Sequence, residues 1–181
     1  MKKERFSQNG IVRKVAFAGM LSALAVAFSA LESLLTPVLP PGAKPGLANI
    51  AVMLGAQYLG FGGAVAVTVV KSVFVLATRG TVAFMMSFAG SVVSAIVTVP
   101  LLRNGKGRVG SIGVGIVGAL THNAMQLAVS VSIMGKAMLW YSPALIMFAL
   151  VNGTLTGTIL HFTMKKLVRW TSVPTDGKEI K

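Results

Sequence analysis

The chain has 181 residues, of which 54% are hydrophobic and only 12% are charged, and its formal net charge is +13. This composition is too apolar for an ordinary soluble domain and is typical of a protein whose solvent is a lipid bilayer. The sequence contains no cysteine, which excludes disulfides, thiol nucleophiles, iron–sulfur clusters and thiolate metal sites.

Six apolar segments follow one another along the chain, and we predict that each forms a transmembrane helix of roughly 20 residues. The first segment is followed by Pro37, Pro40, Pro41 and Pro45, which prevent the helix from continuing. The glycine-bearing stretch 58–63 makes the boundary between the second and third spans the least certain. The predicted spans are 14–35, 46–60, 61–78, 82–102, 109–134 and 139–167, with a polar tail over 171–181. We therefore expect an all-α, polytopic six-helix bundle that forms a single membrane domain over 1–181.

The basic residues lie between the apolar segments instead of lining one face, so they indicate membrane topology and not nucleic-acid binding. Positively charged loops are retained on the cytoplasmic side of a membrane during insertion. One side of the predicted bundle receives only Lys44, Arg79 and Lys136. The other side receives Lys2, Lys3, Arg5, Arg13, Lys14, Arg103, Lys106, Arg108, Lys165, Lys166, Arg169, Lys178 and Lys181. Both termini are therefore expected in the cytoplasm.

Lys71 interrupts the interior of the third span, where an ionisable side chain costs about 2.5–3.5 kcal/mol on insertion scales. Arg79 lies roughly 12 Å further toward the outside of the membrane. In one interpretation Lys71 snorkels to the interface or pairs with Glu32. In the other, a cationic and partly hydrated cavity opens outward and accepts an anionic or strongly polar ligand. The sequence favours the second interpretation and leaves the first open.

Further polar residues occur at a similar depth in the other spans. His122 and Gln126 are four residues apart and share one helix face, so both could hydrogen-bond a ligand held between helices. Such groups could instead satisfy one another across helices. The two histidines, His122 and His161, are too far apart to indicate a metal site, and we expect no cofactor. The candidate substrate-binding residues are Glu32, Lys44, Asn49, Lys71, Arg79, His122, Asn123, Gln126 and Asn152.

Small residues recur at helical spacing in three spans. The stretch GVGIVG at 113–118 matches a dinucleotide fingerprint formally, but it lacks the strand before it and the acidic residue after it. We therefore predict that these glycines, like Gly153 and Gly157, let helices approach closely. On the first span, Gly19, Ala23 and Ala27 form a stripe that serves either internal packing or docking of another membrane protein.

Three motifs carry a resemblance to a known bacterial family. They are LESLL at 31–35, PPGAKPGLANI at 40–50 and GALTHNAMQ at 118–126. With the helix pattern, they resemble a family that has two names, heptaprenyl diphosphate synthase component I and Gx transporter. Under the second name the family is similar to the substrate-binding S-components of energy-coupling factor (ECF) transporters. The resemblance covers nearly the whole chain and implies a place in the bacterial cytoplasmic membrane.

The first family name is tested by the chemistry of prenyl chain elongation. Known synthases hold magnesium on the diphosphate through aspartate-rich motifs, since hard cations demand oxygen ligands. This chain has one aspartate, Asp176, in its polar tail. We therefore do not expect it to be a catalytic synthase of that kind, or an enzyme.

The second family name implies a six-helix protein that binds a vitamin-like nutrient in its outer half. The proline-rich segment 37–45 would then be a lid. Ala23 and Ala27 match the small-residue spacing by which such proteins dock on a shared membrane subunit. The chain has no GxxxxGK[ST] phosphate loop, so energy from ATP would come from separate ATPase subunits.

The leading hypothesis is therefore a substrate-binding component of a small-molecule uptake transporter. Its partners would be a polar or anionic substrate, membrane lipids, a transmembrane coupling subunit and ATPase subunits. The alternative is a non-transporting membrane subunit that handles isoprenoid, quinone or flavin intermediates or anchors a redox assembly. An independent secondary transporter is disfavoured because Glu32 is the sole acidic residue in or near a span.

Overall fold

The computed structural model describes residues 2–35, 46–104 and 110–171, and this part of the chain is helical apart from short turns. The elements are α1 (Lys2–Leu35), α2 (Ala48–Arg79), α3 (Thr81–Asn104), α4 (Ser111–Met134), the 3-10 helix η2 (Lys136–Tyr141) and α5 (Ser142–Thr171). Within these residues, five stretches are long and apolar enough to cross a membrane. They are Ile11–Leu34, Ala48–Arg79, Thr81–Leu102, Ser111–Met134 and Lys136–Thr163. The predicted all-α membrane architecture is confirmed at this level.

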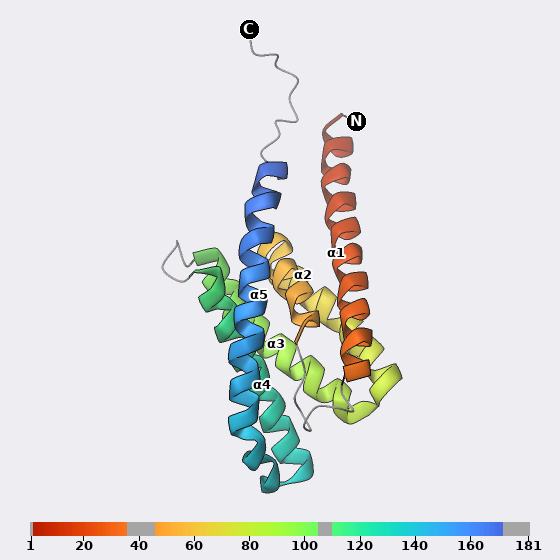
Figure 1. Cartoon of the computed structure of the whole chain (residues 1–181). Coiled ribbons are helices and arrows are strands. Elements are labelled where there is room, and N and C mark those ends of the chain that lie inside the picture. The colour runs from red at the N-terminus through yellow and green to blue at the C-terminus, as the bar shows by residue number, and fades with distance from the viewer. Residues whose placement is uncertain (1, 36–45, 105–109, 172–181) are drawn as a thin grey trace.

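Helix α2 contains a break at Gly60, at the predicted boundary between the second and third spans. Gly60 has φ 75° and ψ −161°, a backbone conformation that is essentially confined to glycine. The break brings Gly55 and Gly63 together: a Cβ on Gly55 would lie 3.2 Å from the carbonyl oxygen of Gly63. Figure 1 accordingly shows the orange and yellow parts of α2 running in different directions. One assigned helix thus consists of two segments, 48–59 and 61–79.

The first segment of α2 forms the centre of the bundle. Eight of its twelve residues are buried, including the unbroken run 50–56, which covers every face of the helix. The run is therefore enclosed by protein and does not face lipid. Leu21 of α1, Val99 of α3 and the residues Val114 and Leu160 supply part of that cover.

Helices α4 and α5 pack closely through glycines. A Cβ on Gly115 would overlap the carbonyl oxygen of Gly153, and a Cβ on Gly157 would lie 2.5 Å from the Cα of Ile112. The absent side chains let the two backbones touch, which is the role of small residues between membrane helices. The predicted packing role of these glycines is confirmed.

Helix α1 lies at the edge of the bundle, and in the described part of the chain it packs against α2 and no other helix. The helix extends back to Lys2, well before the predicted span at 14, because a helix can continue through polar residues beyond the apolar layer. Gly19, Ala23 and Ala27 are exposed on its outer face, and a Cβ on Gly19 would meet nothing within 4 Å. The stripe therefore does not serve packing among the described helices, and docking stays a prediction.

The first turns of α1 and the last turns of α5 lie at the same end of the molecule (Figure 1), opposite η2. The end of α1, where Glu32 lies, is thus remote from the end at which the chain begins. The polar residues described next lie around this end of α1 and the two ends of α2.

Candidate ligand-binding site

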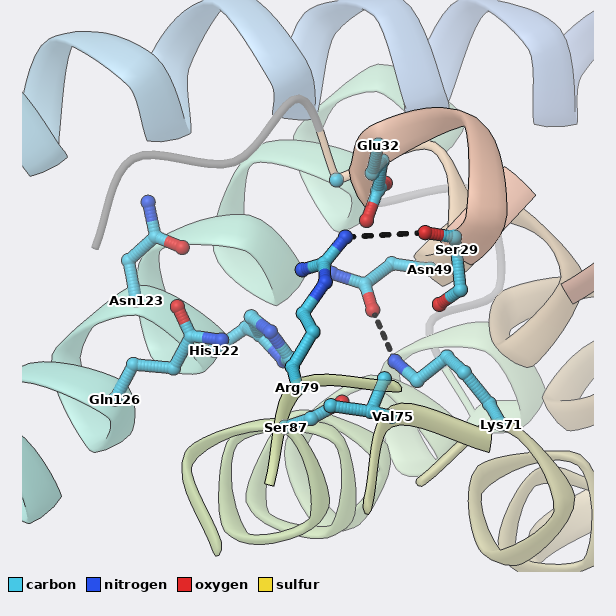
Figure 2. Close-up of a pocket in the computed structure, with 11 residues that line it drawn as sticks. Ser29, Glu32, Asn49, Lys71, Val75, Arg79, Ser87, His122, Asn123 and Gln126 are labelled. Carbon is cyan, nitrogen blue, oxygen red and sulfur yellow. Dashed lines mark hydrogen bonds between the residues drawn. The ribbon is translucent and has the colours of Figure 1, made fainter. Parts of the chain in front are cut away.

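A polar cavity lies between the end of α1 and residues of α2, α3 and α4 (Figure 2). Of the predicted binding residues, it collects Glu32, Asn49, Lys71, Arg79, His122, Asn123 and Gln126. Asn152 lines a neighbouring cavity instead, together with Asn49 and Asn123. Lys44 and the predicted lid 37–45 lie outside the described residues.

Lys71 is held in the interior of the bundle by α2 and α3. Its side chain is only 3% exposed, so it does not snorkel to an interface. The ammonium Nζ donates to Asn49 Oδ1 at 3.0 Å and to Ser91 Oγ at 2.7 Å. Figure 2 shows the bond to Asn49, which links the second segment of α2 back to the start of the first. These hydrogen bonds compensate part of the cost of burying a cation.

Arg79 joins the end of α2 to the end of α1. Its Nη2 donates to the carbonyl oxygen of Ser29 at 3.1 Å, and its Nε donates to Ser33 Oγ at 2.9 Å. Nη2 also contacts Ser33 Oγ. The planar guanidinium thus hydrogen-bonds one turn of α1 through two of its nitrogens.

Glu32 joins α1 to the other end of α2. Its Oε1 accepts the backbone N–H of Ala48, the first residue of α2, at 3.0 Å. The first amides of a helix have no partner within the helix, and the helix dipole favours a negative charge there. Glu32 is buried, and its carboxylate also attracts Arg79 electrostatically. One carboxylate therefore interacts with both ends of α2, through a hydrogen bond at the first and an electrostatic attraction at the last.

Replacing Glu32 by alanine is expected to lower the free energy of unfolding by about 1–3 kcal/mol, because the variant leaves a helix-terminal amide and Arg79 without this carboxylate. Chemical unfolding of the detergent-solubilised chain measures the effect. Glu32→Gln retains an oxygen acceptor and is the matched control, with a smaller loss expected. Equal stability of Glu32→Ala and the wild type would contradict this structural role.

Helix α4 supplies the wall opposite α1. His122 and Gln126 are both buried and line the cavity from one face of α4, as their spacing predicts. The imidazole of His122 packs on Gly90 of α3, where a Cβ would lie 2.9 Å from the ring. Asn123 also lines the cavity, and its Nδ2 donates to the carbonyl oxygen of Leu145 at 3.0 Å, which ties α4 to α5.

Several serines of the site were missed by the sequence interpretation. Ser29 and Ser33 accept hydrogen bonds from Arg79, and Ser91 accepts one from Lys71. Ser87 lines the cavity. The pairs Ser29/Ser33 and Ser87/Ser91 each have the four-residue spacing of one helix face, which was the available signal. Serine is common in membrane helices, so the spacing alone did not mark these positions.

The cavity is suited to binding an anion. Its lining holds two cationic side chains against one carboxylate, with amide and hydroxyl groups between them. The space that water can occupy is about 20 Å³, so a larger ligand must displace side chains on entry. Within residues 2–35, 46–104 and 110–171, no three His, Cys, Asp or Glu side chains are placed to hold a metal ion.

Comparison with known protein families gives a match over most of the chain. The model of a family described as heptaprenyl diphosphate synthase component I matches residues 21–163, a range that contains every residue lining the polar cavity. No curated protein and no solved structure matches the chain.

Proposed function

The chain belongs to the heptaprenyl diphosphate synthase component I family, and we propose that it is the substrate-binding membrane component of a small-molecule uptake transporter, of the kind found in ECF systems. The substrate is a polar or anionic molecule, and separate ATPase subunits drive its transport.

The observation that carries this proposal is the burial of Lys71 at the wall of a polar cavity. An ionisable group at membrane depth is costly, and in membrane proteins such groups mark substrate and ion pathways. Lys71 and Arg79 of α2 and His122 of α4 reach the same small volume. Lys71 and Arg79 supply positive potential, while Asn49, His122, Asn123 and Gln126 orient the ligand.

The proposed topology has six membrane passes, with the two segments of α2 counted separately. The break at Gly60 and the shared end of α1 and α5 support it. Together with the distribution of lysines and arginines, they favour cytoplasmic termini in the bacterial inner membrane. The polar cavity then lies in the outer half of the bundle, where a substrate from outside can reach it.

The chain requires partners in this proposal. The family description itself names a component, which is compatible with an assembly of several subunits. The exposed stripe Gly19, Ala23 and Ala27 on α1 is the proposed docking face for a transmembrane coupling subunit. Small residues allow a partner helix to approach closely.

The family description favours a second candidate, a non-transporting membrane subunit that handles isoprenoid, quinone or flavin intermediates. Catalysis of prenyl elongation by this chain is not proposed, because the sequence has a single aspartate and that chemistry needs several carboxylates around magnesium.

Native mass spectrometry of the full chain, gently extracted from its own membrane, separates the two candidates. We expect a retained polar or anionic small molecule together with ATPase subunits. Retention of a prenyl or quinone lipid with no ATPase subunit would overturn the transport proposal in favour of the second candidate.

A further inference from the structure

A further cavity, distinct from the one that Asn152 lines, adjoins the polar one on its α4 side. It lies between α3, α4, η2 and α5, and water can occupy about 90 Å³ of it, against about 20 Å³ in the polar cavity. Its walls are mainly apolar and include Met86, Met134, Met138, Leu127 and Leu145. The mechanism proposed above makes no use of this space.

The two cavities share a wall that is one side chain thick. Gln126 lines both of them and is itself almost fully buried. On α3, the neighbouring residues Ser87 and Met86 line the polar and the apolar cavity respectively. Asn123 of the polar cavity donates to the backbone of Leu145, which lines the apolar one.

The linings differ in chemistry across that wall. The polar side offers Lys71 and Arg79, which attract an anion. The other side offers three methionines, whose flexible and polarisable side chains adapt to apolar groups of varied shape. Met134, which is 55% exposed, brings the far end of the apolar cavity to the surface of the bundle.

We propose that the two cavities form one site for an amphiphile, with its anionic group at Lys71 and an apolar chain among Met86, Met134 and Met138. The inference rests on the proposed function and narrows its substrate to phosphate or carboxylate compounds that carry an apolar chain. Gln126 stands at the junction, where its amide can turn to hydrogen-bond the anionic group and open the passage.

Equilibrium dialysis of the full chain in nanodiscs tests this site, with empty nanodiscs subtracted to remove partition into lipid. The probes are labelled inorganic phosphate, hexyl phosphate, acetate, hexanoate and hexanol. Hexyl phosphate or hexanoate is expected to bind at least about tenfold more tightly than its chainless partner, because several methylenes leave water. Whichever pair shows this gain identifies the anionic group. Hexanol is expected to bind at least about tenfold more weakly than the better of the two charged probes, because it lacks the anion.

Filling the apolar cavity distinguishes the contribution of the ligand's apolar chain to binding from that of its anionic group. Met138→Trp is expected to reduce binding of the preferred six-carbon probe about tenfold, to the level of its chainless partner, and to leave that partner unchanged. Met134→Trp is the second filling variant in case Met138→Trp does not fold. Met147→Trp is the matched control, since Met147 is 64% exposed and does not line the cavity.

The outcomes distinguish this inference from the proposed function. If the six-carbon anions and their chainless partners bind with equal affinity, and binding of both depends on Lys71, the proposed anion site is supported and the amphiphile proposal fails. The proposal also fails if both filling variants keep wild-type affinity for the six-carbon probe. If no anionic probe shows binding that depends on Lys71, the amphiphile proposal and the proposed anion site fail together.

Discussion

Replacement of Lys71 by methionine is expected to reduce anion binding by at least about thirtyfold, because removal of one partner from a buried charge interaction costs about 2–5 kcal/mol. The methionine side chain has a similar length and no charge, so the space is kept while the positive potential is removed. The measurement is the affinity for the anionic ligand identified in the wild-type protein, made in nanodiscs.

The stability of the Lys71→Met protein provides a second readout. Removal of a buried cation relieves its desolvation cost and offsets the lost hydrogen bonds to Asn49 and Ser91, so the unfolding temperature is expected to change little. A loss of binding without a loss of stability would separate a binding role from a structural one. Lys136→Met, an exposed lysine on η2, is the matched control and should bind normally. Wild-type affinity in Lys71→Met would remove Lys71 from the site.

The second large effect is expected from Gly115→Ala, which should lower the free energy of unfolding by about 3 kcal/mol. The new Cβ would overlap the carbonyl oxygen of Gly153 and lie 2.6 Å from the backbone nitrogen of Gly157. These are backbone atoms, so no change of rotamer relieves the overlap and α4 and α5 must separate. Thermal unfolding of the detergent-solubilised chain measures the loss.

Gly62→Ala is the control for the general effect of changing a helical glycine. A Cβ at Gly62 meets nothing within 4 Å, and alanine favours the helix by up to about 1 kcal/mol over glycine. We expect this variant to match or exceed wild-type stability. An equal effect of the two substitutions would contradict the close packing of α4 on α5.

The helices were predictable because the bilayer demands long apolar runs, and the runs are visible in the sequence. The site was predictable in part for the same reason. Lys71, His122 and Gln126 are conspicuous among apolar residues, and polar side chains in a membrane are more stable when they cluster away from lipid. Their convergence in one cavity agrees with the sequence interpretation. Asn152 falls in the neighbouring cavity, because the rotation of α5 about its axis, which periodicity does not define, decides which wall it joins.

Other features needed coordinates. The fold-back of α2 depends on the conformation of one glycine, Gly60, and the sequence around it contains three more glycines that could have served equally. The hydrogen bonds of Arg79 to Ser29 and Ser33 depend on how the end of α1 is placed against the end of α2. The segment that connects α1 to α2 lies outside the described residues. The apolar cavity beside Gln126 arises from imperfect filling between helices, which no residue pattern reveals.

The break at Gly60 also bears on how the chain enters the membrane. At about 1.5 Å per residue the segment 48–59 is only about 18 Å long, well short of the roughly 30 Å hydrocarbon layer. This segment is too short to span the hydrocarbon layer alone, and we expect it to be integrated together with 61–79 as a hairpin. The Ala48 amide at the start of this hairpin can donate to Glu32 only after α1 has been inserted. We therefore expect α1 to be inserted before the hairpin packs, so that the first helix orients the centre of the bundle.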